Sequence, residues 1–207
     1  MKFAAFVSGC VLGVCFVAPT WSQSSPASQV ARKIPPWWVS MEFGEGQLKL
    51  SSDQLQGSHV PTFAMGLAGG YQPVNGFRIG FHANGWLLQA IDVMNAPPKG
   101  EFTSNTAGIV DIFPGRQTRL FVRGGLGVAT YTNYRPMGVN GLGLGWETGG
   151  GYEIPVHRLV RLVPTVEYAA GNLGNGSSDT KPNQTGLHYS AVEFKLSVVG
   201  SFGPRKR

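Results

Sequence analysis

Three residues near the carboxyl end are of the types that form a hydrolytic triad: His188, Ser190 and Glu193. A serine nucleophile needs a histidine base within hydrogen-bond reach and a carboxylate that orients this base. If the segment is a β-strand, His188 and Ser190 share one face, whereas Glu193 points to the opposite face. We therefore predict that these are polar residues near the end of a strand, and that the chain is not an enzyme.

The remaining histidines, His59, His82 and His157, are far apart in the sequence. No two histidines of the chain have the spacing of metal ligands, so we predict neither a metal nor a cofactor. His59 and His157 fall in expected connections. We interpret His82, which lies on a polar strand face, as a hydrogen-bonded interior residue.

The composition points to β-structure. Of 207 residues, 30 are Gly, 42% are hydrophobic and 14% are charged. This hydrophobic content excludes a disordered chain, the glycines keep no collagen period, and each Gly inside a helix costs about 1 kcal/mol. The basic residues are scattered except at the end of the chain, which argues against a nucleic-acid partner. An all-β chain with glycine on one strand face remains.

Residues 1–22 have the layout of a secretory signal peptide. A single lysine precedes an uncharged apolar stretch, and small residues stand before the expected cut after Ser22. The apolar stretch is shorter than the ~20 residues that a membrane-spanning helix needs. Both cysteines fall inside it, so the mature chain has no disulfide. We expect a flexible linker over 23–36, the folded domain over 37–202 and a basic tail over 203–207.

Beyond the linker, apolar residues recur with period two in eight segments, which are joined by alternately short and long connections. This alternation is typical of outer-membrane barrels, with tight periplasmic turns and longer outer loops. We predict an all-β, eight-stranded antiparallel up-and-down transmembrane β-barrel with short periplasmic turns and four longer outer loops. Pro164 predicts a bulge or a local irregularity inside its strand. The expected strands are 37–48, 61–72, 76–88, 104–113, 118–131, 141–154, 159–170 and 188–202.

The charges of these segments fall on the face away from the large apolar side chains. In segment 118–131, Leu120, Val122 and Leu126 alternate with Arg123. Because an Arg or Lys that faces lipid near the membrane midplane costs about 2–4 kcal/mol, we expect the charges to point into the lumen and pair there. An eight-stranded barrel has room for side chains and little else, which excludes a wide pore. The predicted ion-pair network, with a structural role, consists of Glu42, Arg78, Asp111, Arg123, Glu147, Arg161, Glu167, Glu193 and Lys195.

A soluble barrel would show the same alternation, with its apolar face inward and its charges in water. The aromatic residues favour the membrane, because they gather at strand ends as the two girdles of a membrane barrel do. The set expected near the short turns is Trp37, Trp38, Tyr71, Phe77, Phe113, Phe121, Tyr152 and Phe202, and the set near the long connections is Phe63, Trp86, Phe102, Tyr131, Tyr168 and Tyr189.

Three stretches carry a family resemblance: 120–128 (LFVRGGLGV), 149–155 (GGGYEIP) and 164–168 (PTVEY). With them the chain resembles the small outer-membrane β-barrel proteins of Gram-negative bacteria, the OmpA/OmpX-like superfamily, over about 38–202. The resemblance implies architecture rather than activity. It also implies that Phe202 is the terminal aromatic of the signal that the barrel assembly machinery reads.

We therefore expect an exported barrel, favoured as a monomer, in the outer membrane of a Gram-negative bacterium. Its surroundings would be outer-membrane lipids and lipopolysaccharide, and its role structural or adhesion-type, through the outer loops. A narrow channel for ions or small solutes is the alternative. Because some members of the superfamily deacylate lipid A, a lipid A-modifying hydrolase that uses His188 and Ser190 is the second alternative.

Overall fold

The computed structural model describes residues 36–53, 56–89, 100–115, 118–133, 140–176 and 184–203. The predicted signal peptide, almost all of the linker and all but the first residue of the basic tail lie outside the described residues. No helix in the described ranges is long and apolar enough to cross a membrane. The strands are β1 (Trp37–Ser51), β2 (His59–Val74), β3 (Phe77–Gln89), β4 (Gly100–Ile112), β5 (Leu120–Asn133), β6 (Asn140–Tyr152), β7 (Ile154–His157), β8 (Val160–Gly176) and β9 (Gln184–Phe202).

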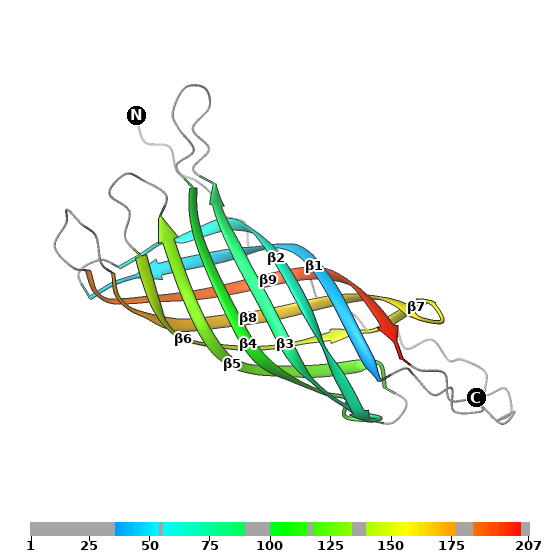
Figure 1. Ribbon diagram of the computed structural model, residues 1–207. Coiled ribbons are helices and arrows are strands. Elements are labelled where there is room, and N and C mark those ends of the chain that lie inside the picture. The colour runs from blue at the N-terminus through cyan, green and yellow to red at the C-terminus, as the bar shows by residue number, and fades with distance from the viewer. Residues whose placement is uncertain are drawn as a thin grey trace, which may run out of the picture. The chain divides into compact units, whose positions relative to one another are not determined.

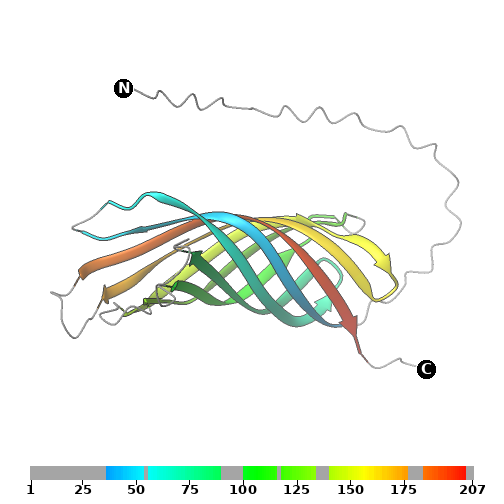
Figure 2. The same ribbon diagram turned by 90° about the horizontal axis from the view of Figure 1, so that it is seen from above.

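The sheet closes on itself. Strands β1 to β6 pair antiparallel in chain order, β6 pairs with β8, β8 with β9, and β9 with β1. The first strand, blue in Figure 1, therefore lies beside the last one, orange to red, and Figure 2 shows the same seam from above. Since β7 continues β6 and pairs with β8, the wall has eight strands, and the predicted up-and-down barrel is confirmed.

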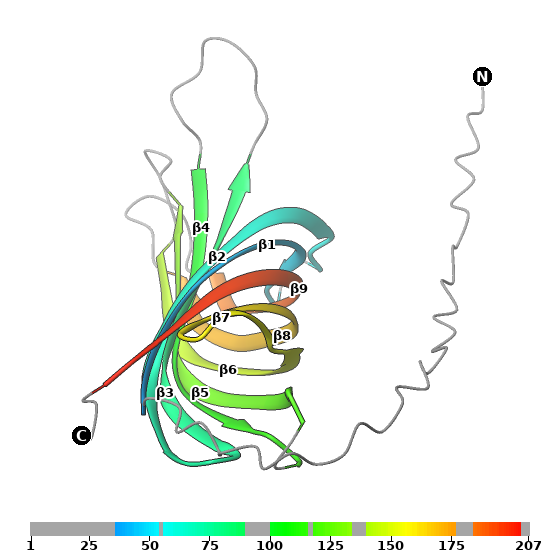
Figure 3. The ribbon, with the colours of Figure 1, turned by 90° about the vertical axis from the view of Figure 1, so that its right-hand side faces the viewer.

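The register sets the tilt of the strands. A path through directly opposed residues leaves β1 at Trp38 and returns to it at Leu48, ten residues further along. In a barrel of eight strands this stagger corresponds to a tilt of about 40°, and Figure 3 shows the strands coiling round the barrel. The path runs through Trp38, Gly70, Gly80, Ile109, Gly125, Glu147, Ala169, Ala191 and Leu48.

The two faces of each strand differ sharply. On β9, Phe194, Leu196 and Val198 face outward and are 60%, 49% and 49% exposed, whereas Glu193 and Lys195 between them are 1% and 0% exposed. A water-soluble protein keeps charges outside and large apolar side chains inside. The reversed pattern, repeated around the barrel, leaves a continuous apolar exterior that only lipid can cover.

The strand predicted over 141–154 is wrong at its end. The strand β6 stops at Tyr152, and residues 154–157, most of which we predicted as a turn, form β7. Between them, the backbone N–H of Glu153 donates at 2.9 Å to the carbonyl of Arg119, the residue that would follow in the register of β5 with β6. Its side chain points inward to two arginines described below.

Of the two alternatives expected at Pro164, the structure has no bulge, because β8 passes through Pro164 in regular register with Leu196 of β9, but it has a local irregularity on the other side of the strand. The pairing of β8 with β6 ends at Thr165, and its pairing with β7 starts at Leu162. Pro164 therefore lies where the ladder on that side is interrupted, and its missing N–H removes no regular hydrogen bond. The irregularities of β8 lie instead near its end, between Asn172 and Gly176.

Six aromatic residues predicted for the girdles point into the barrel instead. Alternation decides their side: Trp37 faces outward and stacks on Tyr71, with ring centroids 5.0 Å apart, so Trp38 must face inward. On the opposite half of the exterior, Trp146 and Tyr168 form a similar pair at 5.3 Å. The inward-facing aromatics are the half-buried Phe113 and five residues that are each at most 8% exposed, Trp38, Trp86, Phe121, Tyr131 and Tyr189.

The apolar exterior predicts that a charge introduced on the outer face lowers stability more in the middle of a strand than near its end. Leu126, in the middle of β5, is 76% exposed on the outer face. We expect Leu126→Arg to lower the free energy of unfolding in lipid vesicles by about 2–4 kcal/mol. The matched variant Leu142→Arg, two residues from the start of β6, should lose about 0–1 kcal/mol. Equal losses, measured by denaturant titration of the vesicle-bound protein, would contradict a lipid-facing exterior.

Candidate functional site

The interior is divided into layers along the barrel. At the end with the long connections lies the outer layer, an apolar cluster that includes Leu48, Trp86, Leu173, Leu187 and Tyr189. The middle is the charged layer. At the end with the short turns lies the aromatic layer, where the apolar side chains include Trp38, Phe113, Phe121, Val163 and Val199. The prediction of a lumen filled by charged and polar side chains therefore holds only for part of it, because strand ends place large apolar residues inward.

Two carboxylates, Glu42 on β1 and Glu167 on β8, form the centre of the charged layer. The ammonium of Lys195 lies 3.2 Å from Glu42 Oε2 and 3.1 Å from Glu167 Oε2. The guanidinium of Arg123 approaches the same two carboxylates at 3.4 and 3.8 Å. Each cation thus bridges strands that are not neighbours, and the network ties the walls of the barrel across its interior.

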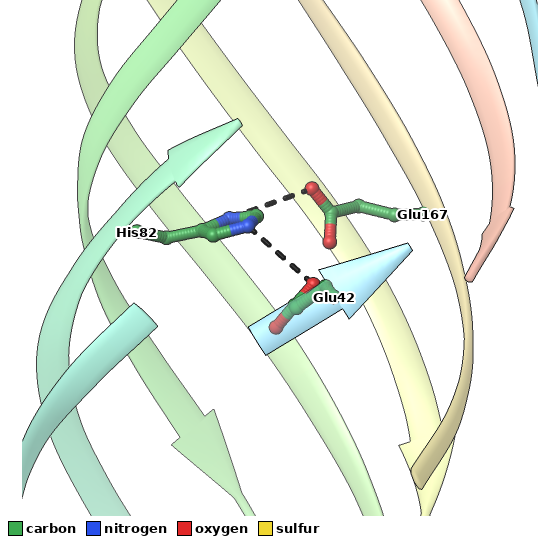
Figure 4. A group of neighbouring side chains, drawn as sticks. All are labelled: Glu42, His82 and Glu167. Carbon is green, nitrogen blue, oxygen red and sulfur yellow. Dashed lines mark ion pairs between the residues drawn. The ribbon is translucent and has the colours of Figure 1, made fainter. Parts of the chain in front are cut away.

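The imidazole of His82 completes this centre. Its Nδ1 lies 2.7 Å from Glu147 Oε1 and 3.7 Å from Glu167 Oε1, and its Nε2 lies 3.5 Å from Glu42 Oε2. Figure 4 shows Glu42 and Glu167 on two sides of the ring. A ring with a carboxylate at each nitrogen is suited to donate from both, as the imidazolium does. His82 is therefore a member of the network. Our sequence analysis interpreted it as a hydrogen-bonded interior residue and did not include it in the predicted network.

The remaining charges attach to this centre. Arg123 donates to Asp111 through Nε at 2.8 Å and through Nη2 at 3.3 Å, a two-point contact that fixes the guanidinium plane. Glu193 accepts a hydrogen bond of 2.6 Å from the amide of Asn84 and lies 3.6 Å from Lys195. In the described part of the layer, five carboxylates face two fixed cations and His82, so that every cation has several partners. The carboxylates are Glu42, Asp111, Glu147, Glu167 and Glu193.

A second group of charges lies inside the aromatic layer. Arg78 contacts Glu153 at 2.5 Å, and Arg161 approaches the same carboxylate at 3.6 Å and donates to Ser201. The guanidinium of Arg78 also stacks 4.7 Å from the ring centroid of Phe113. Our sequence analysis missed Glu153, although its even spacing from Glu147 on the same strand was a sufficient signal for an inward side chain.

Glycines provide the volume for these long side chains. A Cβ added at Gly66 would lie 3.0 Å from the Nε2 of His82, and one at Gly125 would lie 2.9 Å from the Cγ of Glu147. At Gly149 the Cβ would approach Glu167 Cγ at 3.2 Å. Glycine therefore stands on the inward face next to the long charged side chains, because the narrow interior has no room for a further side chain at those positions.

The residues Glu42, His82 and Glu167 also have a donor set that metal ions use, with one ligand atom each within 4.8 Å of the others. The ammonium of Lys195 already contacts both carboxylates, so a positive charge occupies the position that a metal would take. A dication there would be repelled by Lys195 and Arg123. These residues do not fit a metal centre, and the absence of a metal stays a prediction.

The three residues of the possible triad are not assembled. His188 and Ser190 face outward, and the Nδ1 of His188 lies 2.9 Å from the carbonyl oxygen of Gly186. Glu193 is buried in the charged layer with Asn84. The wall of the barrel separates the carboxylate from the base that it would have to orient, so this set cannot act as a nucleophile, base and orienting acid.

Comparisons with known proteins bear on the fold. No family model and no curated protein matches the chain. The structure of Ail, the attachment invasion locus protein of Yersinia pestis, matches at a TM-score of 0.52 with 10% identity and covers 79% of this chain and 99% of Ail. The fold is that of a small outer-membrane β-barrel. The Neisserial surface protein A is also similar, at 18% identity and a TM-score of 0.49, over 80% of this chain and 97% of that one.

The similarity to Ail thus agrees with the predicted barrel architecture. OprG from Pseudomonas aeruginosa, at 11% identity and a TM-score of 0.42, covers 83% of this chain and 98% of its own. Identities this low describe architecture alone. What this barrel does must therefore be argued from its own interior and its own surfaces.

The charged layer predicts a large effect from one substitution. Lys195→Met removes the ammonium from between Glu42 and Glu167 and takes from these buried carboxylates the closest of their positive partners. We expect the free energy of unfolding to fall by about 3–5 kcal/mol. Adding Glu167→Gln to Lys195→Met removes one of these stranded charges and should recover part of the loss. Denaturant titration in vesicles measures both variants, and additive losses would show that the pair does not interact.

Proposed function

We propose that the protein is an integral barrel of a Gram-negative outer membrane that conducts no ions and acts structurally or by binding partners through its outer loops. The proposal includes export by way of the predicted signal peptide over 1–22, assembly through the terminal aromatic Phe202, and the structural role of the predicted network. Two properties support it: the apolar exterior demands lipid, and the interior is closed.

The outer layer is the observation that carries this proposal. Trp86 and Tyr189 lie across the interior with ring centroids 5.5 Å apart, and they are 0% and 2% exposed. Leu48, Leu173 and Leu187 fill the space around them. An ion that entered from this end would first have to cross a layer without charged groups, which is costly for any unpaired charge.

Binding through the outer loops is the role that such a closed barrel leaves available. Binding residues are commonly carried on loops that a rigid scaffold positions. The charged layer supports a rigid scaffold, because the contacts of Arg123 with Glu42 and of His82 with Glu147 join strands that are not neighbours. Ail, which has the same fold, bears the name of an attachment protein, so this architecture is compatible with attachment.

Closure of the interior predicts the outcome of a conductance measurement. We expect the refolded full-length protein to show no unitary current steps in planar bilayers, while a sixteen-stranded porin in the same bilayers conducts. Steps in the wild-type protein whose size changes in Arg123→Ala or Glu147→Ala would establish the narrow channel instead.

A loop exchange tests the binding role. Replacing residues 90–99, between β3 and β4, with a Gly/Ser linker of equal length should leave folding intact, because no ladder pairing of the described barrel includes them. Intact folding is read as heat-modifiable migration on gels. We expect adherence of bacteria that display the protein to cultured epithelial cells to fall for this variant or for the matched exchange of 134–139. Unchanged adherence after exchange of all four long connections would contradict the proposal.

A further inference from the structure

One buried carboxylate of the interior has no positive charge to balance it. The buried charged side chains of the described ranges are six carboxylates, four ammonium or guanidinium groups and the imidazole of His82. Even with His82 as an imidazolium, one negative charge remains in excess. An unpaired ionised carboxylate in a protein interior is so costly that the group binds a proton and becomes neutral instead. The carboxylates are Glu42, Asp111, Glu147, Glu153, Glu167 and Glu193, and the cations are Arg78, Arg123, Arg161 and Lys195.

The contacts identify Glu193 as the carboxylate in excess. Each of the other five has a cationic or imidazole nitrogen within 3.2 Å. Among the described residues, Glu193 forms an ion pair with Lys195 alone, at 3.6 Å, and the same ammonium lies closer to Glu42 and Glu167. Glu193 Oε1 accepts a hydrogen bond from the neutral amide of Asn84, and its Oε2 makes no hydrogen bond in the described part of the barrel.

The register places a like charge opposite Glu193. Glu167 of β8 is its direct partner in the ladder, and the Cβ atoms of such pairs are about 5 Å apart. Two ionised carboxylates so placed repel each other, and one of them is relieved by binding a proton. Glu167 retains its charge, because the ammonium of Lys195 lies at 3.1 Å from it. Arg123 at 3.8 Å and His82 at 3.7 Å, drawn beside Glu167 in Figure 4, add to this effect.

We propose that the folded barrel binds a proton at Glu193, so that this side chain is a neutral carboxylic acid at neutral pH. The proton balances the interior charges and turns Glu193 into an O–H donor opposite the acceptor Glu167. The charged or titratable side chains around it are Glu42 on β1, His82 on β3, Glu147 on β6, Glu167 on β8, and Tyr189 and Lys195 on β9.

This proton links the stability of the barrel to the pH. A glutamate in the unfolded chain titrates near pH 4.3 and is ionised at neutral pH. Unfolding therefore releases the proton of Glu193, and a rise in pH favours the unfolded chain at this site. The effect is opposite in sign to that of an ion-paired carboxylate such as Asp111, which binds its proton more readily in the unfolded chain.

The variant Glu193→Gln tests the proposal by denaturant titration in vesicles at several pH values. Glutamine keeps the size of the side chain and the oxygen that accepts from Asn84, and it is neutral at every pH. Between about pH 5 and pH 7, we expect the folding equilibrium constant of the wild-type protein, divided by that of the variant, to fall about tenfold per pH unit. A ratio that stays constant or rises with pH would overturn the proposal.

The matched control is Glu45→Gln, because Glu45 is exposed on the outer face of β1. This variant should keep the pH dependence of the wild-type protein. Infrared spectroscopy adds a readout that is independent of stability, since a protonated carboxyl group has a C=O stretching band that ionised carboxylates lack. At neutral pH the wild-type protein and Glu45→Gln should show this band.

The band should be absent in Glu193→Gln. Its absence from the folded wild-type protein, or its persistence in Glu193→Gln, would contradict a proton at this residue. Heat-modifiable migration shows that the variants are folded. Neither readout involves the outer loops or conductance, so the result is independent of the loop-binding role and of the closed interior.

Discussion

Every strand of this protein has only two faces, and lipid takes one of them. All groups that lipid cannot accept must therefore fit on the other face, inside a barrel of eight strands. Charged groups placed there lose their hydration, and hydrogen bonds and ion pairs with one another must replace it. The contacts of Lys195 and Arg123 with Glu42 and Glu167 meet this requirement, and the positions of the remaining interior groups follow from it.

The glycine content is a direct consequence of the same constraint. Long inward side chains such as Glu147 and Glu167 need empty volume on the facing strands, and Gly125 and Gly149 supply it. A composition rich in glycine and poor in charge is thus the signature of a narrow barrel with a charged centre. Lys195 has such a glycine neighbour too, because a Cβ added at Gly44 would lie 2.9 Å from its Cγ.

Sequence alternation was enough to predict the strands, the closed barrel and the face of each charged residue, because a period of two is a local property. Alternation could not predict at which residue the inward face of a strand changes from charged to apolar side chains. Trp86 and Tyr189 occupy strand ends, where position alone suggests a girdle, yet their even spacing from Asn84 and Glu193 places them inside. Glu153 could have been predicted as an inward residue from its even spacing to Glu147, but its partner Arg78 is on another strand, and the register of the closed sheet brings the two together.

The layered interior separates stability from recognition. The charged layer lies between the outer layer and the aromatic layer, and its ion pairs join residues of different strands. The residues that remain for recognition are those beyond the apolar band on the outer face and in the connections.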